Sequence, residues 1–454
     1  MNPLTSPLLT DLYQLTMLHA YQVHRMTDTA VFELFVRKLP PTRNFMIAAG
    51  LDQALALLEQ LRFSSDELAW VRESGRFGSG FAEYLESLRF SGDVYAMPEG
   101  TVFFPEEPIL RVVAPLPEAQ LVETRLMNLV QFETMIASKA ARAVLVASDK
   151  LLVDFGLRRA HGAEAGLLAA RASYLAGFSG TATVLAGAAF GVPLYGTMAH
   201  AFVQAHDDEV DAFARFVEVY PGGTTLLIDT YDTEQAARKV VALAKRLAPR
   251  GIRIGGVRLD SGDLGALAKN VRAIFDAAGL SEMKIFASGN LDENRIHELL
   301  AVGAPIDGFG VGTSLVTSSD APSLDTVYKL QEYAGKPRRK RSDAKATWPG
   351  RKQVFRHYDG AGRMQYDVVS TEDDHAQTGE PLLVRVMAAG RRVGPAESLD
   401  SIRARTAGEL ARLPESLRGL TPSAPRYSVT IAPALHKLAR EVDAACAEVP
   451  ALCR

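Results

Sequence analysis

Apolar runs alternate with amphipathic segments from about residue 150 to residue 315, which is the pattern of βα units around a parallel sheet. The run TTLLIDT at 224–230 is followed by TEQAARKVVALAKRLA at 233–248, where apolar residues recur at helical spacing. The same strand-then-helix order returns at 252–279 and at 284–303, and DGFGVGT at 307–313 closes the series. This pattern predicts an α/β fold with a barrel-like domain.

Strand-like runs flank this region on both sides. They occur at 30–39 and 93–117, in a hairpin at 353–370 that turns at Asp359 to Gly362, and at 381–393. We therefore predict an irregular (β/α) barrel domain at 121–335 and a smaller mixed sheet domain built from both termini. Residues 1–120 form its N-terminal part, and residues 336–454 form its C-terminal part and a helical tail.

Composition argues against several classes of protein. Lys and Arg number 50 against 53 Asp and Glu, and a net charge of -3 gives no field that would hold a nucleic acid or an acidic membrane. The two cysteines, Cys446 and Cys453, can neither staple the fold nor complete a structural zinc site. The N-terminus lacks the pattern of a secretory signal, and no apolar run reaches the length of a membrane span. We expect a cytoplasmic enzyme that acts on small molecules.

Polar residues follow each predicted strand of the barrel. They are Asp229, then Arg258 and Asp260, then Ser288 and Asn290, then Gly312 and Thr313. In a parallel barrel the carboxyl ends of the strands open on one face, and that face carries the active site. We expect these side chains to surround one polar mouth.

Two segments offer groups for phosphate chemistry. In GVPLYGTMAHAFVQAH at 191–206, Thr197 and His200 follow a predicted strand, and a histidine can act as a nucleophile toward phosphorus. On spacing alone, a structural histidine is the favoured interpretation of this segment. In VDFGLRRAHG at 153–162, Arg158 and Arg159 can grip an anion, or they can form surface ion pairs with Asp154 and Glu164.

Other segments have a structural alternative as well. Arg258 with Asp260 and Asp263 can orient a phosphoribosyl group and coordinate Mg²⁺, although an N-cap alone would explain Asp263. GFGVGTS at 308–314 and SGN at 288–290 can cradle phosphate. The basic run Arg338 to Arg341 either reaches a polyphosphate or forms a solvated loop. Near the start, Tyr13 either stacks on a flat ring or packs half-buried.

Read together, these segments resemble nicotinate phosphoribosyltransferases over nearly all of residues 1–335. The resemblance rests on TDLYQLTM at 10–17, FELFVRKLP at 32–40, DFGLRR at 154–159, GFSGTATVLAG at 177–187, GTMAHAFV at 196–203, RLDSGDL at 258–264 and GVGTSLVT at 310–317. Seven motifs in the family's order are a specific signal. The C-terminal hundred residues match the family only loosely.

The resemblance implies a type II phosphoribosyltransferase fold and a homodimer with shared active sites, in which the partner's N-terminal segment completes the nicotinate site. It places His200 on the phosphorylated histidine, Tyr13 and Thr197 on nicotinate-contacting positions, and Arg258 on a substrate-binding arginine. Gly312 and Thr313 match the phosphoribosyl-binding loop. The implied reaction joins nicotinate to phosphoribosyl pyrophosphate in NAD salvage, with ATP and Mg²⁺ and a phosphohistidine at His200.

One position separates the acid from the amide as substrate. Relatives that use nicotinamide carry an aspartate where this chain has Ala182, and a buried carboxylate there would repel nicotinate. Ala182 therefore favours nicotinate. A quinolinate-using enzyme would need a denser ring of Lys and Arg than DFGLRR supplies. A catalytically inactive phosphate sensor is disfavoured because Tyr13, His200, Arg258 and Asp260 are all present.

Overall fold

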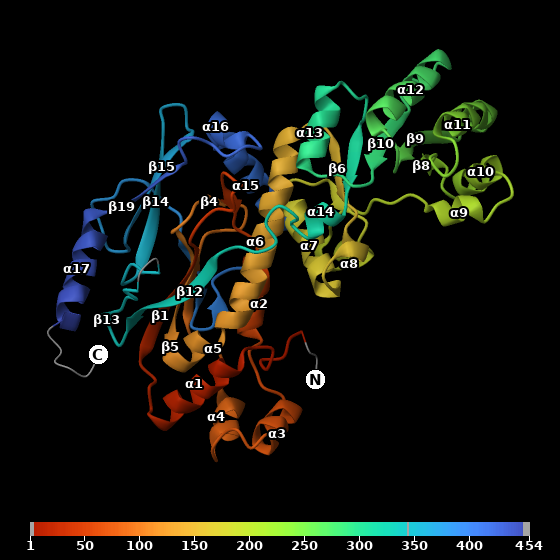
Figure 1. Cartoon of the computed structure of the whole chain (residues 1–454). Helices are drawn as coiled ribbons and strands as arrows, with labels where there is room; N and C mark the ends of the chain where they lie inside the picture. The colour runs from red at the N-terminus through yellow and green to blue at the C-terminus, as the bar shows by residue number, and fades with distance from the viewer. Residues whose placement is uncertain (1–3, 343–344, 448–454) are drawn as a thin grey trace. The chain divides into compact units, whose positions relative to one another are not determined.

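The computed structural model describes residues 4–342 and 345–447 (Figure 1). The chain forms two compact units, the first from Met1–Met135 and Ser323–Arg454, and the second from Ile136–Pro322. The first unit takes both ends of the chain, and the second is one continuous segment. The unit built from both termini is therefore the larger of the two, whereas the sequence predicted that it would be the smaller.

A seven-stranded antiparallel sheet forms the centre of the first unit. Its strand order is β13 (Lys336–Pro337), β12 (Thr326–Tyr333), β1 (Thr29–Val36), β5 (Pro108–Pro115), β3 (Asp93–Ala96), β17 (Val384–Ala388) and β18 (Arg391–Arg392). Strand β1 is buried from Ala30 to Val36 and pairs with β5 on one side and β12 on the other. An apolar run therefore lies at the centre of this sheet, and β17 confirms the strand predicted within 381–393.

Two further sheets belong to the first unit. Four strands follow the order β16 (Glu380–Pro381), β14 (Lys352–Tyr358), β15 (Met364–Thr371) and β19 (Ser428–Ile431), and β2 (Met46–Ile47) pairs with β4 (Val102–Phe103). The β14–β15 hairpin turns where the sequence predicted it. There, Asp359 Oδ1 accepts from the backbone N–H of Arg363 at 2.8 Å, and Gly362 takes a φ of 76°. Glycine tolerates this left-handed backbone best.

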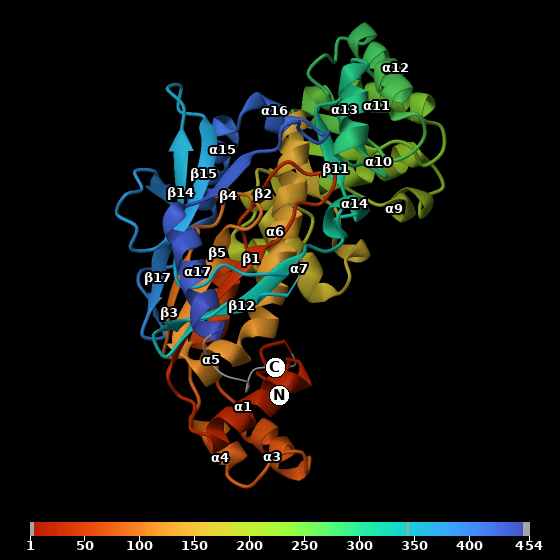
Figure 2. The same cartoon turned by 60° about the vertical axis from the view of Figure 1, so that its left-hand side comes forward.

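The helices of the first unit come from both ends of the chain. They are α1 (Leu12–Val23), α2 (Leu51–Glu59), α3 (Ser65–Glu73), α4 (Phe81–Ser87), α5 (Leu116–Leu121), α15 (Leu399–Arg412), α16 (Glu415–Arg418) and α17 (Pro433–Ala447). In Figures 1 and 2, α1, α3 and α4 lie together near the N-terminus. A capping box between Ser64 and Glu67 begins α3, which explains why a helix starts at this polar sequence.

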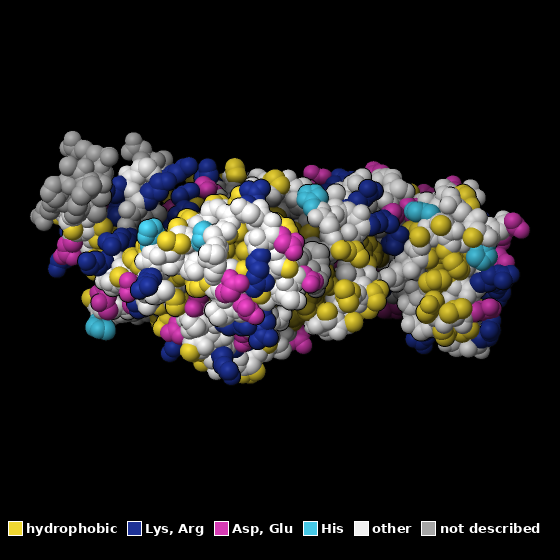
Figure 3. All heavy atoms as spheres, turned by 90° about the horizontal axis from the view of Figure 1, so that it is seen from below, with side chains coloured by type: hydrophobic (Ala, Val, Ile, Leu, Met, Phe, Trp, Pro, Cys, Tyr) yellow, Lys and Arg dark blue, Asp and Glu magenta, His cyan; other side chains and the backbone are white. Residues whose placement is uncertain are grey.

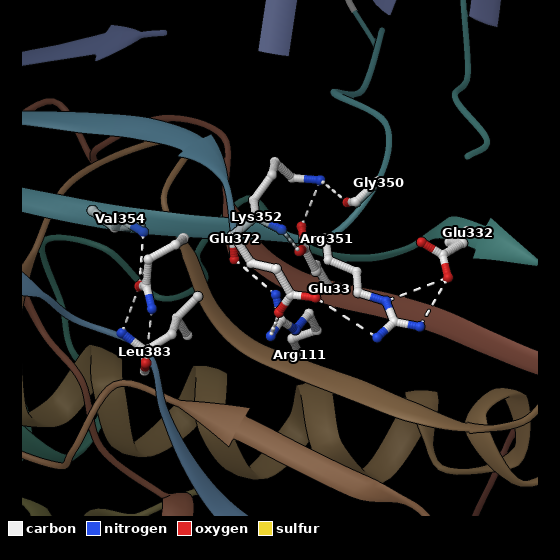
Figure 4. A network of polar contacts seen from close by, with 10 residues as sticks. Glu33, Arg111, Glu332, Gly350, Arg351, Lys352, Val354, Glu372 and Leu383 are labelled. Atoms are coloured by element: carbon white, nitrogen blue, oxygen red, sulfur yellow. Dashed lines mark hydrogen bonds and ion pairs between the residues drawn. The ribbon is translucent and has the colours of Figure 1, made fainter. Parts of the chain in front are cut away.

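A cluster of charged side chains joins two sheets of the first unit, as Figure 4 shows. We call Glu33, Arg111, Lys352 and Glu372 the paired cluster. Lys352 Nζ lies 2.7 Å from Glu33 Oε2, and the two side chains are 5% and 0% exposed. Arg111 donates to the backbone oxygen of Lys352 at 3.0 Å and pairs with Glu372 at 2.5 Å. These contacts connect β1 and β5 of the larger sheet to β14 of the smaller one.

The second unit is built around a six-stranded parallel sheet that forms a half-barrel. Its order is β7 (Gly180–Thr181), β6 (Leu151–Asp154), β11 (Gly308–Val311), β10 (Lys284–Ser288), β9 (Arg253–Leu259) and β8 (Gly222–Leu227). Each neighbouring pair is parallel. The α/β class is confirmed, and β8 to β11 fall in the apolar runs that predicted them. Strand β7 was not predicted, and the strand expected just before Thr197 is wrong, because only an isolated bridge from Leu194 to Thr181 forms there.

Helices connect these strands. They are α7 (Ala163–Leu175), α8 (Val184–Phe190), α9 (His200–Gln204), α10 (Glu209–Val219), α11 (Thr233–Leu247), α12 (Leu264–Ala277), α13 (Glu293–Ala301) and α14 (Thr313–Val316), with 3₁₀ turns at Leu157–Arg159 and Ala248–Arg250. Asp232, Asp263 and Asp292 cap α11, α12 and α13 by accepting from backbone N–H groups. An aspartate after β8, β9 and β10 thus fixes where the next helix begins.

The unit boundaries differ from the ranges drawn from the sequence. The predicted barrel at 121–335 includes β12, but this strand pairs with β1 in the sheet of the first unit. At the other boundary, α6 (Glu123–Val146) is one continuous helix that begins in the first unit and ends in the second. A helix carries no break in its sequence pattern where the packing partner changes, so the pattern alone could not locate this boundary.

Three expectations from composition concern the surface and the chain ends. Within residues 4–342 and 345–447, no helix is long and apolar enough to cross a membrane. The side chain of Cys446 and all of Cys453 lie outside the described residues. On the face that Figure 3 shows, acidic and basic side chains are mixed, with hydrophobic side chains visible between them.

Candidate functional site

Polar side chains meet where β8, β9 and β10 of the second unit end. The backbone N–H of Asp260 donates to Asp229 Oδ2 at 3.1 Å, and the Ser261 hydroxyl donates to the same oxygen at 2.6 Å. Ser288 Oγ donates to Asp260 Oδ1 at 2.5 Å. Neighbouring parallel strands bring their carboxyl ends to one edge, so residues about 30 positions apart in the chain lie in contact.

His200 and Arg258 join this group from other segments. We call Thr197, His200, Asp229, Arg258, Asp260 and Ser288 the strand-end cluster. His200 is the first residue of α9, and its Nδ1 lies 3.1 Å from Thr230 Oγ1. Its Nε2 lies 3.7 Å from Asp260 Oδ2, and the two side chains are 39% and 28% exposed. The histidine is therefore held in place, yet it remains accessible to a ligand.

Arg258 is half-buried and contacts a neutral group. Its Nη1 donates to Thr197 Oγ1 at 2.7 Å, and its Cζ lies 5.9 Å from the ring centroid of Phe155. Burial lowers the pKa of Arg258, the nearby carboxylates of Asp260 and Asp229 oppose this, and the charge of Arg158 lowers the pKa further. The positive charge of Arg158 thus adds to that of Arg258 at this end of the sheet.

Two polar atoms of the cluster are buried without a partner. Arg258 Nε and Asp229 Oδ1 have no hydrogen bond to any residue that the structure describes. A buried polar atom without a partner costs free energy, so native proteins keep few of them, and water, an ion or a ligand usually satisfies those that remain. One donor and one acceptor in the same cluster indicate a site for a polar ligand.

The end of β6 carries a buried carboxylate that fixes a neighbouring segment of the site. The Asp154 carboxylate is fully buried and accepts from Thr181 Oγ1 at 2.7 Å and from the backbone N–H of Gly156 at 2.8 Å. Burial raises the pKa of Asp154 to about 6, and these two hydrogen bonds limit the rise. Asp154 thus fixes the start of the DFGLRR segment, whose Arg158 is exposed on the following 3₁₀ turn.

The two glycine-containing loops have backbones suited to close approach. Gly289 takes a φ of 95°, and a Cβ there would lie 2.0 Å from the backbone oxygen of Asp260. Only glycine fits, which brings the loop after β10 against the loop after β9. The next residue, Asn290, is exposed at a φ of 49°. Gly312 precedes α14, and Thr313 is exposed at its first position.

Asp263 has the structural role that was its alternative. Its Oδ1 accepts from the backbone N–H groups of Gly265 and Ala266 at 3.1 and 3.2 Å, which caps α12. No group of three or more His, Cys, Asp or Glu side chains that could hold a metal occurs among the residues described. A Mg²⁺ ion at Asp260 and Asp263 would therefore need oxygen atoms from a substrate and from water.

Two further candidates belong to the first unit. Tyr13 lies in the first turn of α1 and is 47% exposed. Its partial burial raises the pKa of its hydroxyl group, and the nearby charges of Glu123 and Asp11 raise this pKa further. In the basic run, Arg339 and Arg341 lie 3.2 and 3.9 Å from carboxylate oxygens of Asp443. The alternative to binding a polyphosphate was a solvated loop, whereas Arg339 and Arg341 pair with an acid of α17.

The large cavity of the second unit does not coincide with the cluster. It occupies about 1160 Å³ and is lined by Gly222, Gly255, Lys284 and Gly308, all from the amino-terminal part of their strands. Of the strand-end cluster, as far as the structure describes the lining, Thr197 alone reaches it. The ionisable cluster lies at the other ends of the strands, and we base the chemistry on those groups.

Sequence analysis missed Thr230, Ser261 and Thr181. Thr230 contacts His200, Ser261 contacts Asp229, and Thr181 contacts Asp154. Thr230 and Ser261 each directly follow an aspartate that had been singled out, so a hydroxyl after a strand-end acid was the available signal. Thr181 carried no such signal, because its partner lies 27 positions away on another strand.

Comparisons with known proteins agree with this arrangement. Three family models match the chain: the nicotinate phosphoribosyltransferase N-terminal domain at 8–131, the nicotinate phosphoribosyltransferase family at 151–354, and the corresponding C-terminal domain at 375–439. The third match corrects an expectation from the motifs, since the C-terminal region, which resembles the family only loosely in its motifs, also matches a family model.

Individual relatives cover most of the chain. It is 49% identical to nicotinate phosphoribosyltransferase pncB2 of Mycobacterium tuberculosis, over 93% of this chain and 91% of the relative. It is 44% identical to a Bacillus subtilis nicotinate phosphoribosyltransferase, over 76% and 72%. A crystal structure of human nicotinic acid phosphoribosyltransferase superposes with a TM-score of 0.86 at 30% identity, over 95% and 99%.

Proposed function

The chain belongs to the nicotinate phosphoribosyltransferase family and is an enzyme of that activity, and we propose that its strand-end cluster carries out the reaction and couples it to ATP. In this reaction nicotinate displaces pyrophosphate from phosphoribosyl pyrophosphate and forms nicotinate mononucleotide for NAD salvage. The observation that carries the proposal is the meeting of His200, Asp260 and Arg258 at one edge of the parallel sheet.

The cations of the site act on the anionic substrates. Arg258 and Arg158 lie close enough to influence each other, and both can bind a carboxylate or a phosphate through paired N–H groups. We assign Arg258 and Thr197, which are already hydrogen-bonded, to the nicotinate carboxylate. We assign the phosphoribosyl part to Ser288 at the end of β10, Asn290 in the loop that follows, and Gly312 and Thr313 directly after β11.

The preference for the acid over the amide rests on Ala182. This residue is exposed just after β7, and its backbone N–H donates to the oxygen of Asp154 at 2.8 Å. A methyl group there neither repels a carboxylate nor accepts a hydrogen bond from an amide NH₂ group. The site therefore favours nicotinate through Arg258 without opposing it at position 182.

Asp260 stabilises the charge that develops on the ribose. The bond from the anomeric carbon to pyrophosphate breaks with its electron pair on the pyrophosphate oxygen, and the sugar gains oxocarbenium character. Ser288 holds Asp260 Oδ1, which fixes the carboxylate without cancelling its charge. The ring nitrogen of nicotinate then donates its lone pair to the anomeric carbon. Correct placement of these two atoms supplies much of the rate enhancement.

ATP acts through His200. The histidine takes the terminal phosphoryl group of ATP and ADP leaves, so that a dianionic phosphohistidine stands beside Asp260. The added charge repels Asp260 and draws nearby cations, which changes the geometry of the site that binds pyrophosphate. Water later hydrolyses the phosphohistidine to histidine and phosphate. The free energy of ATP hydrolysis thereby favours formation of the mononucleotide.

Asp260 and Asp263 suit a Mg²⁺ ion bound jointly with a substrate. Magnesium prefers hard oxygen ligands and commonly takes one or two carboxylates together with phosphates and waters. The cap on α12 uses Oδ1 of Asp263 alone, so it is compatible with a contact from the other oxygen. Bound Mg²⁺ would neutralise charge on the pyrophosphate group.

Tyr13 belongs to this proposal as a residue supplied by a second copy of the chain. It is 47% exposed on α1 of the first unit, and an exposed aromatic ring can stack on nicotinate. We therefore propose a homodimer with shared active sites, each an incomplete barrel completed by the partner's N-terminal segment. An enzyme of this kind, acting on soluble phosphorylated metabolites, suits the cytoplasm.

Substrate competition tests the function directly. Pyrophosphate release from phosphoribosyl pyrophosphate is measured with nicotinate, nicotinamide or quinolinate, each with and without Mg-ATP. We expect release that depends on nicotinate and is stimulated by ATP. Release with nicotinamide alone would contradict the argument from Ala182, and release with quinolinate accompanied by CO₂ would indicate the other enzyme class.

A further inference from the structure

A second group of charges is buried inside the second unit, away from solvent. Lys139 Nζ, on α6, lies 2.8 Å from Glu293 Oε2 and 3.1 Å from Asp320 Oδ1. Arg142 Nε, one turn further along α6, lies 2.9 Å from Glu293 Oε1. The exposed fractions are 3% for Lys139, 5% for Arg142, 1% for Glu293 and 13% for Asp320.

The two acids follow the two loops of the site. Glu293 is the first residue of α13, directly after the loop that follows Ser288 and carries Asn290. Asp320 follows α14, whose first residue is Thr313. The ammonium group of Lys139 thus contacts one acid after each of the two loops assigned to the phosphoribosyl group.

Further hydrogen bonds connect the two loops to each other and to Asp320. Ser314 Oγ donates to the backbone oxygen of Leu291 at 2.6 Å, which joins the α14 turn to the loop before α13. Within the turn, the backbone N–H of Ser319 donates to the oxygen of Ser314 at 3.1 Å, next to Asp320. A shift of Asp320 would therefore be transmitted to Thr313, and a shift of Glu293 to Asn290.

Burial of these charges needs an explanation beyond stability. Removing ions from water costs several kcal/mol per ion, and hydrophobic side chains of similar volume often stabilise a protein equally well. A buried ion pair does, however, fix distance and direction, because ammonium and carboxylate groups tolerate little separation in a medium of low dielectric constant. These buried charges adjoin the two loops assigned to the phosphoribosyl group, and a fixed distance between those loops would matter for binding.

We propose that Lys139 is a positioning residue for phosphoribosyl pyrophosphate. By binding Glu293 and Asp320 together it holds the loop after β10 and the α14 turn at one separation, which is the separation that the phosphoribosyl group requires. Lys139 is 3% exposed and does not touch the substrate. This inference rests on the proposed function, because that function assigns the two loops to the phosphoribosyl group.

The test uses Lys139→Met, which keeps the length of the side chain and removes its charge. In steady-state assays with saturating Mg-ATP, we expect KM for phosphoribosyl pyrophosphate to rise by about tenfold or more, because a small displacement of binding groups is costly. KM for nicotinate and kcat should change by less than about twofold, since Thr197 and Arg258 lie on other segments. Lys139→Arg should restore most of the affinity.

Two more variants keep the test decisive if Lys139→Met folds poorly. Asp320→Asn alters the more exposed partner and should raise the same KM, and combining it with Lys139→Met should add little, because both remove one interaction. Lys284→Met is the matched control. Its ammonium lies 3.2 Å from Asp307 in an exposed pair at the start of β10, so KM should not change.

The outcomes separate this inference from the proposed function. A rise confined to phosphoribosyl pyrophosphate supports the positioning role, and equal rises for both substrates, or no rise in folded variants, would overturn it. If the wild-type protein shows no nicotinate-dependent turnover, the proposed function fails instead. Equilibrium binding of phosphoribosyl pyrophosphate to wild type and to Lys139→Met then tests the positioning role without turnover, and equal affinities would overturn it.

Discussion

The paired cluster of the first unit and the strand-end cluster of the second unit hold their charges in different ways. In the paired cluster of the first unit each charge contacts an opposite one, Glu33 with Lys352 and Arg111 with Glu372. In the strand-end cluster of the second unit, Arg258 instead contacts the neutral hydroxyl of Thr197, and its Nε is buried without a partner among the residues described. The charges of the paired cluster are satisfied by one another, whereas a charge that faces a neutral group can still bind a substrate.

The largest expected effect comes from breaking the paired cluster. Lys352→Met leaves the carboxylate of Glu33 buried without its cation, which should lower the free energy of unfolding by about 3–5 kcal/mol. Denaturant titration followed by circular dichroism measures this loss. The double variant Glu33→Leu with Lys352→Met is the control and should recover much of the stability. A loss below about 1 kcal/mol in the single variant would show that the pair is not structural.

Removing the charge of Asp260 should act on the reaction and leave folding intact. Asp260→Asn keeps the shape of the side chain but cannot stabilise a developing positive charge, so kcat should fall by about 100-fold to 1000-fold. Asp276→Asn is the matched control, because this acid lies on α12 in an exposed pair with Arg272. An unchanged kcat in folded Asp260→Asn protein would remove Asp260 from the mechanism.

Asp154 should make stability depend on pH, because its pKa of about 6 lies above its ordinary value. The folded state holds the proton more tightly than the unfolded state does. Protonated Asp154 therefore stabilises the folded state, and this stabilisation is complete below the pKa of the unfolded state, near 4. It is lost as pH rises to about 6, which lowers the free energy of unfolding by about 3 kcal/mol. Melting temperatures of wild type and Asp154→Asn between pH 4 and pH 7 measure it. Parallel curves for the two proteins would contradict this assignment.

The smallest expected effect on stability comes from substitutions of Asp263. They distinguish a helix cap from a contact with Mg²⁺. Asp263→Ala should cost about 1 kcal/mol of stability, and Asp263→Asn, which keeps a capping oxygen, should cost much less. If the carboxylate also contacts Mg²⁺, both variants should need more Mg²⁺ for half-maximal activity. Equal Mg²⁺ requirements in wild type and Asp263→Asn would leave Asp263 with the cap alone.

Local features of both units could be predicted from the sequence. Strands β8 to β11 of the second unit fall in apolar runs, the β14–β15 hairpin turns at Asp359 to Gly362, and the N-cap alternative for Asp263 is confirmed. Each depends on neighbours within a few positions. Propensity and hydrogen bonding act at that range, so they leave a readable pattern.

Features that depend on distant partners could not be predicted in the same way. Lys352 contacts Glu33 across 319 positions, and Arg258 contacts Thr197 across 61. The sequence also did not predict the unit boundary within α6 or the pairing of β12 with β1. Both depend on packing partners that are distant in the sequence, and such partners leave no local signal. For the site, parallel topology predicted which strand ends meet, but not that Thr230 would contact His200.

The most direct test of the account is the coupling of ATP to product in His200→Asn. The molar ratio of ATP hydrolysed to nicotinate mononucleotide formed is measured in wild type and variant, together with transfer of labelled phosphate from ATP to the protein. We predict stoichiometric coupling and an alkali-stable phosphorylated protein in the wild type. In the variant we predict no labelling and a slow transfer that ATP does not stimulate. Full ATP stimulation of His200→Asn would contradict the central claim that the strand-end cluster couples ATP through His200.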